Sequence, residues 1–251
     1  MGLKYKIDAQ LDSPERTIIH KQIIRNKIFL KKLYLEWYAE FKRETGKLPE
    51  GILLELGSGG GFLKEVIPSV ICSDVIPLAS NDLTFSALNM PFESNSVSGI
   101  FMIDTFHHIP DAAKFLHEAK RILINNGQII MIEPANSLQG RVFYKNFHHE
   151  PFDPKGDWTI PSTGPLSGAN GALPWIVFER DIKIFTDTFP ELKISRIKYH
   201  TPFRYILSGG VSFRQVVPDF LFGAYTLSDK ILSALSKHFS MFVTIQIIKV
   251  K

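Results

Sequence analysis

The sequence predicts an α/β fold in which a doubly wound, mostly parallel sheet is covered by helices on both faces. Three observations predict it: short strand-like segments alternate with helical patterns, each such segment is apolar throughout, and a glycine-rich turn follows the first of them. Strands that are buried on both faces of a parallel sheet have this composition. The length of 251 residues suits one domain with elaborations.

The first 48 residues are expected to form an amphipathic helical segment ahead of the domain. Ser13-Pro14-Glu15 supplies an N-cap, a proline at the first helical position and an acid in the first turn. Apolar residues then recur at helical spacing to about Thr45, and Gly46 ends the helix. Such a helix packs across the domain or over its pocket, although a basic amphipathic helix also suits a membrane surface.

Residues 49–251 alternate between strand and helix patterns. The expected elements are strands at 52–56, 70–73, 100–103 and 128–132, a weakly extended segment at 81–88, helices at 62–67, 111–124 and 180–189, and antiparallel strands at 192–199 and 242–250. Two insertions break this pattern, at about 134–178 and 202–240, and insertions of this length are usually lids or binding loops. Ser228 and Asp229 are expected to cap the last helix.

The composition favours a cytoplasmic protein. Its one cysteine, Cys72, excludes an internal disulfide and suits a reducing compartment. The N-terminus lacks the apolar core of a signal peptide, and no apolar run reaches 18 residues. The net charge of +4 comes from basic flanks around a mildly acidic middle. Basic flanks suit an anionic substrate, a phospholipid surface or nucleic acid, and are otherwise ordinary solvated surface.

The stretch LELGSGGGF follows the first strand with a glycine-rich turn. It departs from the dinucleotide fingerprint at Phe62, where the third glycine belongs, and it lacks the lysine of a P-loop. A carboxylate beside a pyrophosphate is costly, whereas S-adenosylmethionine brings an ammonium and a sulfonium that a carboxylate attracts. The glycines let the backbone approach the cofactor, and the N-terminus of the next helix favours its carboxylate. The pattern is an acid followed by alternate glycines: Glu55, Gly57, Gly59 and Gly61.

The second strand ends at Asp74, where a carboxylate can accept hydrogen bonds from both hydroxyls of a ribose. Val75 is expected to cover one face of the adenine. Aspartate is also common in turns, so a turn role is the alternative. The cofactor contacts expected from the sequence are Glu55, Gly57, Ser58, Gly59, Gly61, Asp74, Val75, Ala87 and Asp104.

Several motifs occur together between about Gly51 and Pro134: LELGSGGGFL, the strand-end Asp74, ALNMPFES, and the block IDTFHHIPDAAKFLHEAKRILINNGQIIMIEP. This region resembles the class I S-adenosylmethionine-dependent methyltransferases, particularly the type 11-like group that includes small-molecule enzymes. The resemblance implies S-adenosyl-L-methionine as cofactor and a Rossmann-like sheet of seven strands whose last strand is antiparallel. Two departures are Ser86, where the family often has an acid that reaches adenine, and Asn125-Asn126-Gly127 in place of Pro-Gly-Gly.

Methyl transfer is an in-line displacement, so the enzyme mainly has to align the acceptor. A hydroxyl or amine acceptor also needs a base, which is expected at His107, His108 or Glu133, with Asp104 nearby and with His148, His149 and Glu150 arriving from the first insertion. Histidine is favoured because it titrates near working pH. The alternatives are that a histidine stacks on the cofactor or caps a turn, or that proximity alone suffices.

No metal site is expected. His148, His149 and Glu150, with Asp153, are suitable ligand types. Adjacent histidines, however, point apart on an extended chain, which argues against a shared ion.

The two insertions are rich in aromatic residues, which predicts an aromatic, lipid-like or lipid-linked acceptor. A nucleic-acid acceptor is not expected, for two reasons. Methylation of pyrimidines at C5 needs a cysteine nucleophile, and Cys72 lies within the second strand, away from the site. Enzymes that methylate base amino groups carry two prolines in the turn after the fourth strand, and Asp104-Thr105-Phe106-His107 has none. The rivals are a tRNA or rRNA methyltransferase, suggested by the basic flanks, and a non-catalytic cofactor-binding module. The same flanks suit a peripheral membrane contact. The residues expected to bind the acceptor are Tyr144, His148, His149, Trp175 and Arg204.

Overall fold

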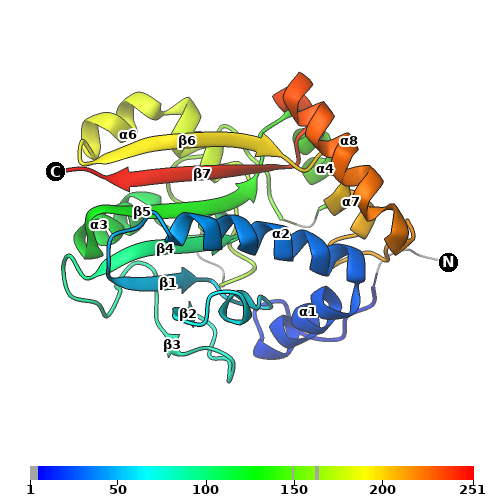
Figure 1. The fold of residues 1–251 in the computed structure, drawn as a ribbon, viewed down its shortest axis with the longest axis horizontal. Helices are drawn as coiled ribbons and strands as arrows, with labels where there is room; N and C mark the ends of the chain where they lie inside the picture. Colours follow the sequence, from blue (N-terminus) through cyan, green and yellow to red (C-terminus); the bar gives the residue numbers. More distant parts are fainter. Residues whose placement is uncertain (1–4, 149, 162–163) are drawn as a thin grey trace.

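The computed structural model describes residues 5–148, 150–161 and 164–251, which form a seven-stranded sheet with helices around it (Figure 1). The strand order is β3-β2-β1-β4-β5-β7-β6. The pairs from β3 to β5 are parallel, and β7 runs antiparallel to both β5 and β6. The predicted seven-stranded sheet with a reversed last strand is confirmed. The strands are β1 (Ile52–Leu56), β2 (Val70–Asp74), β3 (Leu83–Thr84), β4 (Val97–Ile103), β5 (Leu123–Pro134), β6 (Leu192–His200) and β7 (Phe242–Lys249).

Helices surround the sheet, and several short turns connect them to it. The longer helices are α1 (Pro14–Asn26), α2 (Ile28–Thr45), α3 (Ala112–Ile122), α4 (Leu138–Phe147), α6 (Ile182–Thr188) and α8 (Phe222–Leu235). The shorter ones are α5 (Leu173–Trp175), α7 (Arg204–Ser208), a π-helical turn at Ile176–Arg180, and 3-10 turns at Leu63–Glu65, Phe106–His108, Asp219–Leu221 and Lys237–Phe239. No helix in the described ranges is long and apolar enough to cross a membrane.

Alternate residues of the strands enter two separate cores, as the two-residue period of a strand requires. Leu54 and Met131 pack with residues of α3 and α6. Phe101 and Ile130 pack with residues of α2 on the opposite face. Figure 1 shows α2 running across this face of the sheet, and Phe41 within it is completely buried. The N-terminal segment is therefore one of the layers that enclose the sheet.

The single helix predicted from Ser13 to about Thr45 is wrong, because the structure has two helices that meet at Lys27. Lys27 leaves helical geometry with a ψ of 101°. Its buried ammonium donates hydrogen bonds to the carbonyl oxygens of Ser208, Gly210 and Phe213 at the end of α7. The break thus lets one lysine satisfy carbonyl groups that have no helical partner of their own.

Two further predictions need correction. The helix expected at 62–67 is only the 3-10 turn Leu63–Glu65, so the predicted contribution of a helix N-terminus to cofactor binding has no structural basis there. Ser228 and Asp229 lie inside α8 and do not begin it. The buried Asp229 instead accepts hydrogen bonds from the backbone N–H groups of Phe203 and Arg204, at the start of α7.

Candidate active site

A cavity of about 470 Å³ lies where β1, β2, β4 and β5 reach their carboxyl ends. This volume falls within the roughly 300–1,000 Å³ of small-molecule sites. In open α/β sheets, ligands bind at this edge, where the strand order reverses, which here is between β1 and β4. The wall is completed by α1, α2, both insertions and the start of β7, including Thr17, His20, Tyr34, Leu166, Tyr205 and Phe242. These wall residues were not predicted as site residues, because only the tertiary fold brings them there.

The glycine-rich turn after β1 depends on two glycines with positive φ. Gly57 has φ +66°, and a Cβ at this position would lie 2.4 Å from the side chain of Thr105. Gly59 has φ +42°, and its N–H donates a 2.9 Å hydrogen bond to Asp74. Gly61 lines the cavity too, but the space that its missing Cβ leaves is taken by the hydroxyl of Tyr38, 2.6 Å away. Close packing against Thr105 and Tyr38 therefore requires glycine at positions 57 and 61, independently of any ligand in the cavity.

Glu55 is buried at the end of β1 and lines the cavity. Its carboxylate accepts hydrogen bonds from the Ser58 hydroxyl at 2.7 Å and the Cys72 thiol at 3.3 Å. Burial raises the pKa of Glu55 to about 7. A cation bound nearby would favour the ionised form, which is the electrostatic property that the sequence argument requires.

Asp74, Val75 and Ala87 all line the cavity. The Asp74 carboxylate joins the two turns at this end, since it accepts hydrogen bonds from the N–H groups of Gly59 and Ile76, both at 2.9 Å. Burial raises the pKa of Asp74 above its ordinary value. Val75 is 50% exposed, so one face of its side chain is available to a ligand.

Asp104, directly after β4, has a φ of +49°, which is uncommon for a residue other than glycine. Its N–H donates to the carbonyl of Ile132 in β5, and the residue lines the cavity. Burial raises the pKa of Asp104 to about 8. A left-handed residue held this way is a common feature of functional turns.

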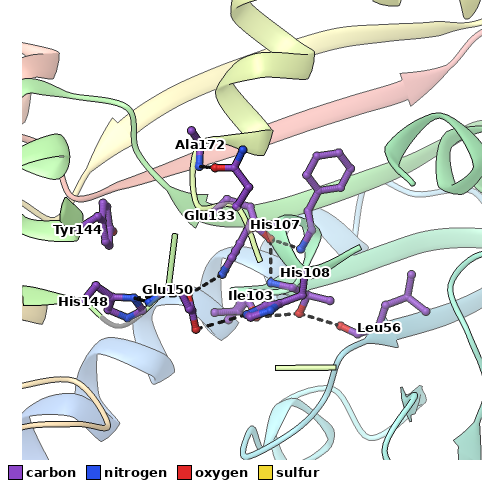
Figure 2. Close-up of polar contacts among 12 residues, drawn as sticks. Leu56, Ile103, His107, His108, Glu133, Tyr144, His148, Glu150 and Ala172 are labelled. Carbon is purple, nitrogen blue, oxygen red and sulfur yellow. Dashed lines mark hydrogen bonds and ion pairs between the residues drawn. The ribbon is translucent and has the colours of Figure 1, made fainter. Parts of the chain in front are cut away.

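His107 is held between two carboxylates at the centre of the site (Figure 2). Its Nδ1 lies 2.7 Å from Glu133 and its Nε2 lies 3.2 Å from Glu150. Glu133 is completely buried and also accepts the N–H groups of Thr105 and Phe106. Burial alone would lower the pKa of His107, but the two carboxylates raise it well above its usual value. In this arrangement His107 is an imidazolium that donates from both nitrogens.

His108, unlike His107, is a neutral imidazole. Its Nδ1 lies 3.0 Å from the carbonyl oxygen of Gly168, which can only accept, so Nδ1 carries the proton. Burial and the charge of His107 lower the pKa of His108 to about 4. Its Nε2 is therefore unprotonated and lies 3.6 Å from Glu150.

Glu150 lies in the first insertion, at about 134–178, which we call the lid, and it connects the lid to this turn. Besides His107 and His108, it lies 3.5 Å from Nδ1 of His148. Burial by itself would raise the pKa of Glu150, but its hydrogen bond to His107 and the neighbouring histidine charges bring it well below its usual value. Its position beside two lid histidines was visible in the sequence, but its contact with the 107–108 turn was not.

The predicted acceptor residues divide into two groups. Tyr144 and His148 line the cavity, with Tyr144 stacked on Phe152 at 5.2 Å. Trp175 and Arg204 are not among the described residues that line it. Arg204 is buried and paired with Asp229 and Glu36, because the buried Asp229 needs a positive partner. His149 lies outside the described residues.

Comparison with known proteins agrees with the fold. Residues 54–131 match the family model described as a methyltransferase domain, and no curated protein matches the chain. A SAM-dependent methyltransferase of Thermotoga maritima, described as a possible histamine N-methyltransferase, is similar over 94% of both chains, with 18% identity and a TM-score of 0.51.

A second solved structure with this fold is geranyl diphosphate C-methyltransferase of Streptomyces coelicolor, in complex with Mg²⁺, geranyl diphosphate and S-adenosyl-L-homocysteine. It is similar over 99% of this chain and 90% of its own, with 13% identity and a TM-score of 0.51. At such identities the similarity shows the fold alone.

The matched domain and the fold together define the class of protein. The chain contains a methyltransferase domain at residues 54–131 and has the fold of the class I S-adenosylmethionine-dependent methyltransferases, as the sequence motifs indicated. It is an S-adenosylmethionine-dependent methyltransferase, and its cofactor is S-adenosyl-L-methionine.

Proposed function

We propose that this enzyme methylates a small apolar or lipid-linked acceptor inside the cavity. One observation carries the proposal: a single cavity joins the glycine turn and Asp74 at one end to a histidine–glutamate cluster and aromatic side chains at the other. The second end is lined by Tyr144, Tyr205 and Phe242. An apolar wall with a few convergent polar groups suits a mainly apolar small molecule.

The transfer is an in-line displacement on the methyl carbon. The acceptor atom bonds to this carbon, the carbon–sulfur bond breaks, and sulfur keeps the electron pair as S-adenosylhomocysteine forms. A hydroxyl or amine acceptor also loses a proton, and the unprotonated Nε2 of His108 can take it, whereas His107 already donates from both nitrogens. Glu133 positions His107 and does not face the acceptor as a base. Alignment of the acceptor with the methyl group can lower the barrier by up to about 7–11 kcal/mol.

The surface near the second end of the cavity supports a lipid-linked acceptor. The helix α4 contributes Tyr144 to the cavity wall and exposes Leu138, Val142 and Phe147 on its outer side. Nearby α8 exposes Leu227, Ile231 and Leu235, and the turn Lys237–Phe239 contacts both helices. We infer a peripheral contact at the cytoplasmic side of a membrane, a compartment that also suits the one unpaired cysteine.

The proposal is tested by incubating the purified chain with methyl-labelled S-adenosylmethionine and three fractions: a lipid extract, a hydrophilic metabolite extract, and total tRNA and rRNA. Label is expected in the lipid extract. Label in the hydrophilic extract alone would exclude the apolar acceptor.

The same experiment separates the rival functions. Label in RNA, with salt-sensitive retention on heparin, would indicate an RNA methyltransferase. Cofactor binding without a labelled product, and with no effect of alanine at His107, His108 or Glu133 on the phenotype, would indicate a non-catalytic module.

A further inference from the structure

Three side chains at the acceptor end of the cavity are placed as ligands of one metal ion. His107, His108 and Glu150 each offer a ligand atom, and these atoms lie within 4.8 Å of one another. All three residues line the cavity, and Figure 2 shows Glu150 facing the two histidines. We propose that they form a binding site for a divalent transition-metal ion such as Zn²⁺, which the sequence did not predict.

The local backbone explains why two adjacent histidines converge. On an extended chain their rings would point apart, which was the reason for expecting no metal at His148 and His149. His107 and His108 instead lie in the 3-10 turn Phe106–His108, and their ring centroids are 4.2 Å apart with a tilt of 40°. The lid then brings Glu150 to within 3.2 Å of the Nε2 atom of His107 and 3.6 Å of the Nε2 atom of His108.

Each histidine is oriented by a hydrogen bond from its other nitrogen. Nδ1 of His107 donates to the buried Glu133, and Nδ1 of His108 donates to the carbonyl oxygen of Gly168. Metal-binding histidines usually have such a partner, which fixes the tautomer and directs Nε2 toward the ion. His108 already presents an unprotonated Nε2, and an ion would replace the proton that His107 shares with Glu150.

The ligand types indicate the class of ion. Two imidazole nitrogens and one carboxylate suit Zn²⁺, Fe²⁺, Co²⁺ or Ni²⁺, whereas Mg²⁺ and Ca²⁺ prefer sites built from oxygen. Three protein ligands leave at least one coordination position for a water or a substrate oxygen. The three ligand residues line the cavity, where His148 also lies close to Glu150.

The ion would deepen the proposed function. An acceptor oxygen bound at the open position would be held beside the cofactor and would lose its proton more readily. This role rests on the proposed function, but the binding site itself does not. With an ion in place, Nε2 of His108 is a ligand and no longer the direct proton acceptor.

The test uses the full chain without an affinity tag, freed of metal by a chelator and then titrated with ZnCl₂ by calorimetry. We expect one ion per chain, and Co²⁺ is expected to show the visible absorption of an ion with nitrogen and oxygen ligands. The variants Glu150→Gln and His108→Ala should each weaken Zn²⁺ binding at least ~10-fold, and Glu133→Gln should weaken it roughly 10–100-fold. The exposed His238, outside the cavity, provides the control variant His238→Ala, which should bind like the native chain.

The proposal is overturned if the native chain shows no saturable Zn²⁺ binding, or if Glu150→Gln binds as tightly as the native chain. Glu150 lies in the lid, and glutamine keeps its volume, so this variant remains informative if His108→Ala fails to fold; the Co²⁺ spectrum needs no variant. Parallel titration with S-adenosylhomocysteine and the labelled-methyl assay separate the two proposals. If the chain transfers methyl groups but binds no Zn²⁺, the proposed function stands and the metal site is rejected. If it binds Zn²⁺ but transfers no methyl group, the metal site stands and the proposed function is rejected.

Discussion

Asp74 connects the two turns that form the cofactor end of the cavity, through the N–H groups of Gly59 and Ile76. We expect Asp74→Asn to weaken S-adenosylhomocysteine binding by roughly 10–100-fold, since hydrogen bonds to a charged group contribute about 1.5–3 kcal/mol. Asparagine keeps one acceptor oxygen, so the turns should persist. Calorimetry measures the effect, with Asp82→Asn as control because Asp82 does not line the cavity. Equal affinity of both variants would exclude a cofactor contact by Asp74.

Glu55 predicts a specific dependence of stability on pH. Its pKa is raised by burial from 4.5 to about 7 in the folded chain. Its contribution to stability is therefore complete below pH 4.5 and is lost as the pH rises through about 7. The loss is on the order of 3 kcal/mol at most, at about 1.4 kcal/mol per pKa unit.

Urea denaturation at pH 5 and pH 8 measures this contribution. The native chain should lose more stability between the two pH values than Glu55→Gln does. The exposed Glu93 provides the control variant Glu93→Gln, which should follow the native chain. Parallel losses in the native chain and in Glu55→Gln would show that the Glu55 carboxyl is not desolvated in the folded protein.

Sequence patterns placed several residues at this site because strand ends of a parallel sheet converge on one edge. His107, His108 and Glu133 end up together for this reason. The contact of Glu150 with His107 joins positions 43 residues apart, and it depends on how the lid folds. The prediction that Arg204 binds the acceptor was wrong for a related reason. Arg204 pairs with the buried Asp229, and the spacing of the two residues in the sequence gives no sign of this contact.

At the scale of elements, hydrogen bonds join the N-terminal segment, at Asp12, to the lid, at Leu166 and Ser167, beside the cavity. One oxygen of Asp12 accepts the N–H groups of Leu166 and Ser167, and the other accepts the Ser167 hydroxyl at 2.6 Å. Leu11 and Leu166 line the cavity on the two sides of this contact. Separation of these two segments would require these bonds to break.

We expect Asp12→Ala to release S-adenosylhomocysteine about 10-fold faster, corresponding to ~1.4 kcal/mol, with little change in the unfolding midpoint. Stopped-flow dissociation measures the rate. Asp8→Ala is the matched control, because Asp8 is exposed and lies in the same segment. An unchanged release rate in Asp12→Ala would show that the cavity opens elsewhere.

Strand and helix types were largely predictable, because buried parallel strands are continuously apolar and α3 has a strong amphipathic pattern. Element boundaries were less predictable where a tertiary contact sets them. The break at Lys27 arises from three carbonyl groups more than 180 residues away. The glycine turn is likewise in a tertiary contact, because the backbone of Lys21 in α1 lies close to Gly60.

At the scale of the whole molecule, α4 and α8 lie near each other at one end (Figure 1), and both helices expose apolar and basic side chains. Leu235 at the end of α8 is 73% exposed, and Phe220 in the turn just before α8 is 82% exposed. Arg141, Lys145 and Lys230 are exposed on the same helices, whereas the only acidic residue of either helix, Asp229, is buried and paired. Exposed apolar side chains among cations suit an anionic lipid surface.

We expect the chain to cosediment with vesicles containing phosphatidylglycerol and to be released partly by salt, because apolar burial and charge both contribute. Leu138→Asp or Leu235→Asp should each weaken binding about 10-fold or more, since burial of a leucine side chain contributes about 1.5–3 kcal/mol. Ile184→Asp is the matched control, because Ile184 is 55% exposed on α6, far from α8 in Figure 1. An equal loss in all three variants would mean that the contact is not specific to this end. Loss in the first two alone would place the membrane beside the helix that also supplies Tyr144 to the cavity.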